Sequence, residues 1–316
     1  MVDSLNLSYL RSSQLIQNKT LPSNVLDTSY SSNGKQEEKS QRTVSDNIIL
    51  SSQAQAILKG TGVAPINAFA QYFPTRSGSP ANALALSVTN PESLSSSKDK
   101  TIAETAVDAK NRLDAKYSSM KSSGRPFDAN SWEGKDMYEL MGELDRRSLY
   151  AVRSNEGGLF TQEEQNMANS IMLQQQGLNM GLYSGPTGKA SSFVDPYSND
   201  SLIRSQVNID FLDRVSAEEK MSAEWIFARS AAQYTYEIHA LDEDINIEAT
   251  KNPLVEMLVN TMRDLNEDGL GFKTAGNIRS FDDIRNQPFI VENNLQESFD
   301  GALVRLSISS TRLGLY

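Results

Sequence analysis

Three short oxygen-bearing side chains alternate along one acidic segment of the chain. Asp264, Asn266 and Asp268 occupy every second position, and Gly269 follows them directly. Side chains at this spacing converge inside a tight turn, and glycine permits the backbone conformation of a sharp bend. Carboxylate and amide oxygens suit a hard cation. The segment therefore predicts a metal site formed by three side chains, with the carbonyl oxygen of Leu270 as a fourth ligand.

This spacing resembles the first half of an EF-hand calcium loop, which has oxygen ligands at positions 1, 3 and 5 and glycine at position 6. The resemblance implies calcium as the ligand and residues 264–275 as the loop. The second half departs from the pattern, because Gly271 replaces an aliphatic residue and Ala275 replaces the bidentate glutamate. The loop then lacks two oxygens, so the expected affinity for calcium is weak, about 0.1–1 mM.

A second stretch, residues 153–164, resembles the same loop in a more degenerate form. Asn155 and Glu164 stand at ligand positions around a central glycine, whereas Arg153 places a cation where the first carboxylate belongs. Together the two stretches imply paired helix–loop–helix units. The alternative is an ordinary glycine turn, in which Thr161 caps the following helix and Glu164 completes a capping box.

An alternating acidic run, residues 242–248, offers another chemistry. If the run is a strand, one of its faces presents Asp242, Asp244, Asn246 and Glu248. Paired carboxylates on such a face would suit a carboxylate-dependent hydrolase. A solvated connector after a helix explains the same pattern.

The residue types that are absent exclude several mechanisms. The 316-residue chain has no cysteine and one histidine, His239. Thiolate nucleophiles, iron–sulfur clusters and cysteine-based zinc sites are therefore excluded, and zinc held by several histidines is not expected. A Ser-His-Asp triad would depend on His239, which lies near the end of a predicted helix and suits the helix dipole there. No complete catalytic set is present, so the sequence favours a protein that is not an enzyme.

Charge is distributed unevenly along this acidic chain. The net charge is −10, and residues 208–300 alone carry 8 basic and 19 acidic groups. Such an acidic half repels phosphate backbones, so nucleic-acid binding is not expected, whereas cations or a basic protein surface are suitable partners.

No apolar run approaches the roughly 18 residues that span a bilayer. The N-terminus lacks the continuous apolar core and cleavage site of a secretory signal. The sequence therefore predicts a cytoplasmic protein, or one secreted by a type III or flagellar-like route that needs no cleaved signal.

Composition divides the chain into three regions. Residues 1–60 hold twelve serines and scattered apolar residues, which predicts a disordered arm with one short helix. Residues 61–97 are rich in Pro, Gly and Ser and are interpreted as a linker with a short helix near Tyr72. Residues 98–316 are interpreted as an irregular, mainly α-helical domain.

The arm contains one stretch, residues 43–58, that resembles the D-x-V-x-L-S-x-x-A segment of flagellar anti-sigma factors. The matching residues, with isoleucine in place of valine, are Asp46, Ile48, Leu50, Ser51 and Ala54. The resemblance implies a bacterial chain and a short helix that docks on a partner.

Helical spacing of apolar residues begins at Ile102 and predicts a helix of about 20 residues. Further helices are expected over 134–152, from Thr161 to Gly177, over 216–239, over 253–265 and over 292–306. Residues 177–207 are expected to be a loop, and residues 306–308 an edge strand. The helix at 216–239 is apolar around most of its circumference, which predicts that it lies at the centre of the core.

Three functions of different classes follow from these patterns. The first is a non-enzymatic helical interaction or regulatory protein that binds a protein partner. The second is a weak calcium-binding, EF-hand-like protein that depends on residues 264–270. The third is the carboxylate-dependent hydrolase that depends on residues 242–248.

Overall fold

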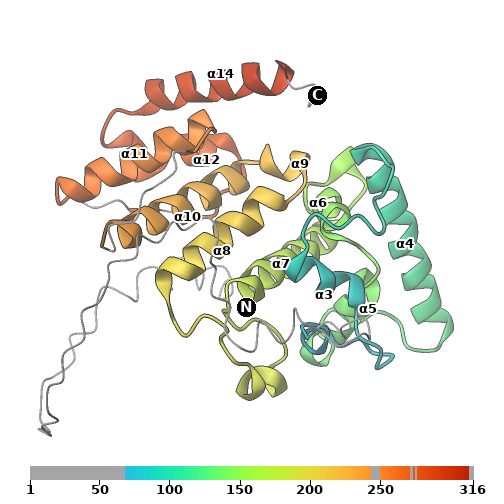
Figure 1. Cartoon of the computed structure of the whole chain (residues 1–316). Coiled ribbons are helices and arrows are strands. Elements are labelled where there is room, and N and C mark those ends of the chain that lie inside the picture. Colours follow the sequence, from blue (N-terminus) through green and yellow to red (C-terminus); the bar gives the residue numbers. More distant parts are fainter. Residues whose placement is uncertain (1–67, 243–249, 271–272, 275, 313–316) are drawn as a thin grey trace, which may run out of the picture.

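The computed structural model describes residues 68–242, 250–270, 273–274 and 276–312 (Figure 1). These residues are mainly α-helical and form no strand, which confirms the predicted fold class. One isolated bridge pairs Pro74 with Pro80. The predicted arm at 1–60, its anti-sigma-like stretch and residues 243–248 of the acidic run lie outside the described residues.

The first half of the described chain runs from blue to green in Figure 1. Its elements, in chain order, are η1 (Ala70–Tyr72), α3 (Asn82–Thr89), α4 (Ile102–Ser122), η2 (Trp132–Gly134), α5 (Lys135–Met141), α6 (Arg146–Arg153), η3 (Glu156–Gly158), α7 (Gln162–Asn179) and η4 (Thr187–Ser192).

Helix α4 forms as the apolar spacing predicts. Ala106, Ala109, Leu113 and Met120 of the predicted face are buried. The helix begins at a capping box, in which the Thr101 side chain accepts a hydrogen bond from the N–H of Glu104 and the Glu104 carboxylate accepts one from the N–H of Thr101.

The predicted linker is wrong for the part of 61–97 that the structure describes. Phe73, Leu84 and Val88 are fully buried and belong to the same core as α4. Helix α3 has no side-chain N-cap, so packing rather than a local signal holds it in place. The proline and glycine residues mark the turns on either side of α3.

The predicted helix over 134–152 is two helices. Helix α5 ends at Met141, and α6 begins after Asp145, whose carboxylate caps it by accepting a hydrogen bond from the N–H of Ser148 at 2.8 Å. Gly142 lies at the break, where a Cβ would stand 3.0 Å from the Cβ of Ala81.

The second half runs from yellow to red in Figure 1. Its elements are α8 (Ser201–Arg214), α9 (Ala217–Lys220), α10 (Ala223–Asp242), α11 (Pro253–Glu267), α12 (Phe281–Arg285), α13 (Pro288–Val291) and α14 (Gln296–Arg312). Two expectations fail here: α8 begins inside the predicted 177–207 loop, and α14 continues through the predicted 306–308 strand.

The predicted helix over 216–239 starts later than expected. Ser216 caps only the single turn of α9, and a second serine, Ser222, restarts the helix by accepting a hydrogen bond from the N–H of Trp225 at 3.2 Å. Helix α10 packs against α8 and α11, and Trp225 and Ile226 are buried. The long helix is therefore central, as predicted, but to the core of the second half alone.

Two hydrophobic cores divide the described residues. The first contains buried side chains from 70–178, and the second contains buried side chains from 209–306. Helices α7 and α8 contact each other where the halves meet. None of the described helices is long and apolar enough to cross a membrane.

Candidate binding cleft

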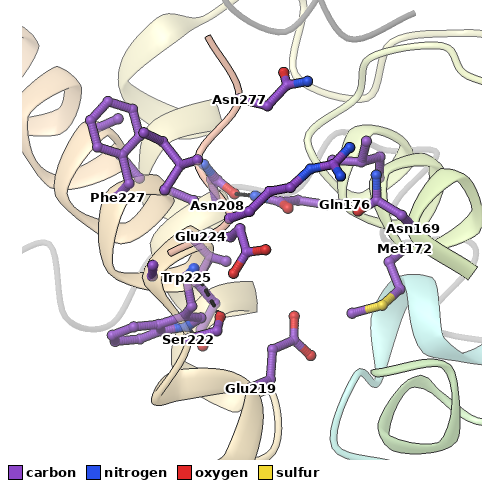
Figure 2. A pocket seen from close by; sticks show the side chains of 18 of the residues that line it. Asn169, Met172, Gln176, Asn208, Glu219, Ser222, Glu224, Trp225, Phe227 and Asn277 are labelled. Carbon is purple, nitrogen blue, oxygen red and sulfur yellow. Dashed lines mark hydrogen bonds between the residues drawn. The ribbon is translucent and has the colours of Figure 1, made fainter. Parts of the chain in front are cut away.

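A cleft of about 850 Å³ lies between the two halves. Helix α7 supplies one wall and α10 the other. Helix α8 lines the cleft between them, and residues 276–281 border it. Figure 2 shows Asn169, Met172 and Gln176 on one side of the cleft, and Trp225 and Phe227 on the other.

The α7 wall is mostly polar and uncharged. Its cleft residues recur every three or four positions along the whole helix, which places them in one stripe. They are Gln162, Gln165, Asn166, Asn169, Met172, Leu173, Gln176 and Met180. Carboxamides along this stripe can both donate and accept hydrogen bonds, so the wall suits an uncharged polar surface.

The α10 wall is more apolar and carries small side chains. Phe227, Ala228, Ala231 and Thr235 follow each other at helical spacing along the cleft and are half-buried. Trp225 and Ala232 also line the cleft but are largely buried in the second core, together with Ile226. One face of α10 therefore remains open to the cleft while its other faces are packed.

Helix α8 fixes the two walls relative to each other. The side-chain amide of Gln176 on α7 donates a hydrogen bond to the side-chain oxygen of Asn208 on α8 at 2.8 Å. The indole N–H of Trp225 on α10 donates to the carbonyl oxygen of Leu212 at 2.8 Å. These buried bonds connect both cleft walls to α8.

A buried ion pair closes one end of the cleft. Nη2 of Arg146, on α6, lies 2.7 Å from Oε1 of Glu219, on α9, and its Nε lies 3.1 Å from Oε2. Nη1 of Arg146 also donates to the carbonyl oxygen of Met172 and to Oε1 of Gln175. The guanidinium stands 4.7 Å from the centre of the Phe211 ring. A bidentate pair with further hydrogen bonds is the arrangement that compensates the burial of two charges.

Two more arginines of α6 pair across the same boundary. Nη2 of Arg147 lies 2.6 Å from Oε1 of Glu218, and Nη2 of Arg153 lies 2.5 Å from Oε1 of Glu224. Burial works against ionisation of Glu218, but its bonds to Arg147 prevail and hold its pKa below the usual range. The halves are thus joined at this edge by charge pairs.

The charges beside the cleft are largely neutralised within the protein. Arg146 and Arg153 are paired as described, and Arg204 on α8 pairs with Asp195. Burial raises the pKa of Tyr150, another cleft residue, to about 12, so its phenol is neutral at physiological pH. Arg279, at the exposed border of the cleft, adds a positive charge. The walls of the cleft therefore offer mainly hydrogen bonds and apolar area.

The residues predicted to hold calcium do not form a turn of alternating ligands. Asp264 and Asn266 lie within the last turn of α11, and Asp268 is its C-cap. The N–H of Gly269, at a φ of 68°, donates to the carbonyl of Asn266, and the N–H of Leu270 donates to the carbonyl of Leu265. This is a glycine helix ending. The side chains of Asp264, Asn266, Asp268 and Leu270 are exposed.

The described residues contain no group of three or more His, Asp or Glu that could hold a metal ion. Residues 271–272 and 275 of the predicted loop lie outside the description. Calcium binding by residues 264–275 stays a prediction.

The second EF-like stretch takes the form of its plainer alternative. A capping box joins Thr161 and Glu164 at the start of α7. The side-chain oxygen of Asn155 accepts a hydrogen bond from the N–H of Phe160 at 2.9 Å. The side chain of Arg153 forms an ion pair with Glu224. Helices α6 and α7 do form a helix–loop–helix unit, with its polar side chains used for capping and for joining the halves.

The structure describes His239 but only the start of the acidic run. Leu241 and Asp242 end α10, while 243–249 lie outside the described residues. His239 is in the last turn of α10, as the dipole argument expects, and it lines the cleft.

The cleft itself is not among the sites that the sequence predicts. Its signal in the sequence is the amide-rich stripe of α7, which has the spacing of an ordinary solvent-facing helix side. The apolar wall resembles any buried helix. Only the packing of two separate cores leaves these two stripes facing each other. Comparisons with known protein families, curated proteins and solved structures give no significant match for this chain.

Proposed function

We propose that this protein is a non-enzymatic interaction protein, and that the cleft between its halves receives a segment of a partner protein. The observation that supports the proposal is the pair of facing helical stripes on α7 and α10. The cleft residues of α7 extend from Gln162 to Met180, which is about 27 Å along a helix axis. A cleft of that length can accommodate a segment of polypeptide.

The chemistry of the walls specifies the partner segment. An amphipathic helix with an apolar face towards Phe227 and Ala231 and an uncharged polar face towards Asn169 and Gln176 satisfies both walls. Helix-in-groove binding of this kind uses anchors three and four residues apart. Methionines at the cleft, such as Met172, adapt their shape to a bound chain.

A fluorescence titration tests the proposal. The chain has two tryptophans, Trp132, which is 76% exposed, and Trp225 at the cleft. In a Trp132→Phe background, the emission of Trp225 should change on addition of an uncharged peptide of about 20 residues that has leucine on one helical face. A peptide of the same composition with leucines spread around the helix is the control.

Two matched variants locate the binding. Ala231→Phe fills the cleft and should abolish the response to the peptide. Val107→Phe adds the same ring at an exposed position of α4, and should leave the response unchanged. The proposal fails if the patterned and control peptides give the same response, or if Val107→Phe and Ala231→Phe have equal effects.

A further inference from the structure

We infer that the cleft binds residues 47–58 of the same chain when no partner is present. The inference rests on the proposed function, because it uses the same cleft for a segment of similar chemistry. The docked segment then competes with the partner protein for the cleft and sets the apparent affinity of the chain for that partner.

The chemistry of the segment matches the two walls. Residues 47–58 are the longest run without a charged side chain within 1–60, although that region carries 11 charged groups. Ile48, Leu50, Ile57 and Leu58 supply apolar area, and all the polar side chains of the run are Asn, Ser or Gln. Between the walls a charged segment would lose its hydration without gaining a free counter-charge, because Arg146, Arg153 and Arg204 are already paired. Arg279 lies at the exposed border of the cleft.

The tether places the segment within reach. The described chain begins at Ala68, and the carbonyl oxygen of Tyr72 accepts a hydrogen bond at 2.8 Å from the side-chain amide of Gln174 on α7. Gln174 lies on a different face of α7 from Gln176 of the cleft wall, because residues two apart on a helix do not share a face. The nine residues 59–67 span up to about 33 Å when extended, which exceeds the width of a helix, about 10–12 Å, so the chain can pass around α7 and bring residues 47–58 to the cleft.

Cysteine cross-linking tests the docking directly, since the chain has no cysteine of its own. The full chain carries Ala54→Cys together with Thr235→Cys on the α10 wall. A short bismaleimide should link this pair within one chain. Ala54→Cys with Val107→Cys, at an exposed position of α4, is the matched control and should link much more slowly. A second pair, Ala54→Cys with Asn169→Cys, samples the opposite wall in case the first variant folds poorly.

Each outcome of the cross-linking has a definite meaning. Faster linkage of both cleft pairs than of the control supports the inference. Equal linkage of all pairs overturns it, because the segment then visits the whole surface alike. A linked dimer in place of a linked monomer also overturns it, because the cleft then takes the segment of a second copy.

The peptide titration separates this inference from the proposed function. Leu50→Glu with Ile57→Glu places charges on the segment and should release it. If the segment occupies nine tenths of the clefts, its release should tighten peptide binding about tenfold. Equal affinity for the two chains overturns the docking of residues 47–58 but leaves the proposed function standing. Absence of binding to the released chain overturns the proposed function itself, whatever the cross-linking shows.

Discussion

Arg146 shows how one side chain connects the two halves of the molecule. It comes from α6, and its acceptors are Glu219 of α9 and two groups of α7. The sequence gives no sign of this pairing, because the two charges are 73 positions apart. By contrast, the capping box of Thr161 and Glu164 can be predicted, since its partners lie three residues apart.

Removal of Glu219 should destabilise the protein strongly. Glu219→Ala leaves the Arg146 guanidinium buried without its counter-charge, which costs about 3–5 kcal/mol of unfolding free energy. The matched control is Glu218→Ala, whose partner Arg147 is less deeply buried, and its cost should be about 1 kcal/mol or less. Urea unfolding measures both, and similar losses for the two variants would contradict the special role of Arg146.

Asp145 is the second residue whose role depends on distant partners. One carboxylate oxygen accepts hydrogen bonds from the N–H groups of Ser96 and Ser97, each at 2.8 Å, and the other accepts from Ser148. Burial opposes ionisation of Asp145, but these donors outweigh it and keep the pKa of the carboxyl below its usual range.

The lowered pKa of Asp145 predicts a pH-dependent contribution to stability. The contribution is fully present above the unfolded-state pKa of about 4 and is lost as the pH falls through the lower folded-state value. Asp145→Asn should therefore cost about 2 kcal/mol at pH 7, and the difference from the wild type should shrink as the pH falls below about 4. Unfolding free energies of both proteins at several pH values test this, and a difference that is independent of pH would contradict it.

At the scale of elements, some helices follow from local signals and others from packing alone. Helices α4, α7 and α11 are predictable from apolar spacing and from caps such as Thr101 and Asn252. Helix α3 is not, because it is short, uncapped and set among prolines and glycines. Helix α8 escapes prediction because it begins directly after a loop rich in glycine and serine, and its cap, Asp200, lies within that region.

Gly269 follows the end of α11, where it serves either as a helix ending alone or also as part of a calcium loop. Its φ of 68° favours glycine, and no atom lies within 4 Å of the position that a Cβ would take, so a substitution acts through the backbone alone. Gly269→Ala should cost about 1 kcal/mol in calcium-free buffer. The measurement is urea unfolding with a chelator present.

Calcium makes a separate contribution that the same assay measures. If residues 264–275 bind it at about 0.1–1 mM, then about 10 mM calcium should stabilise the wild type by roughly 1–3 kcal/mol. Ala275→Glu restores the missing bidentate ligand and should increase this effect. If calcium changes the unfolding free energy of neither the wild type nor the Ala275→Glu variant, the EF-hand interpretation is wrong.

At the scale of the whole molecule, the prediction of a single helical domain from residue 98 misses the main feature. Two cores, each built from neighbouring elements, meet at charge pairs and amides, and the cleft results from that junction. Hydrophobic periodicity identifies which residues are buried. It does not show that Leu113 and Leu258 are buried in different cores.

Limited proteolysis tests the organisation of the whole chain. Trypsin should cut first among Lys35, Lys39 and Arg42, in the region whose composition predicts disorder. Lys59, next to the docked segment, should be cut more slowly in the wild type than in the Leu50→Glu, Ile57→Glu variant. The core from residue 68 onwards should persist in both. A wild type that resists cleavage throughout residues 1–45 would contradict the predicted arm.

The separation of the two cores along the sequence bears on how the chain folds during synthesis. All buried residues of the first core lie within 70–178, so this half can complete its packing while the second half is still being translated. During that interval α9 does not yet exist, and the guanidinium of Arg146 must stay hydrated. Glu219 is translated later and displaces that water when it pairs with Arg146, so the junction between the halves forms after the first core has packed.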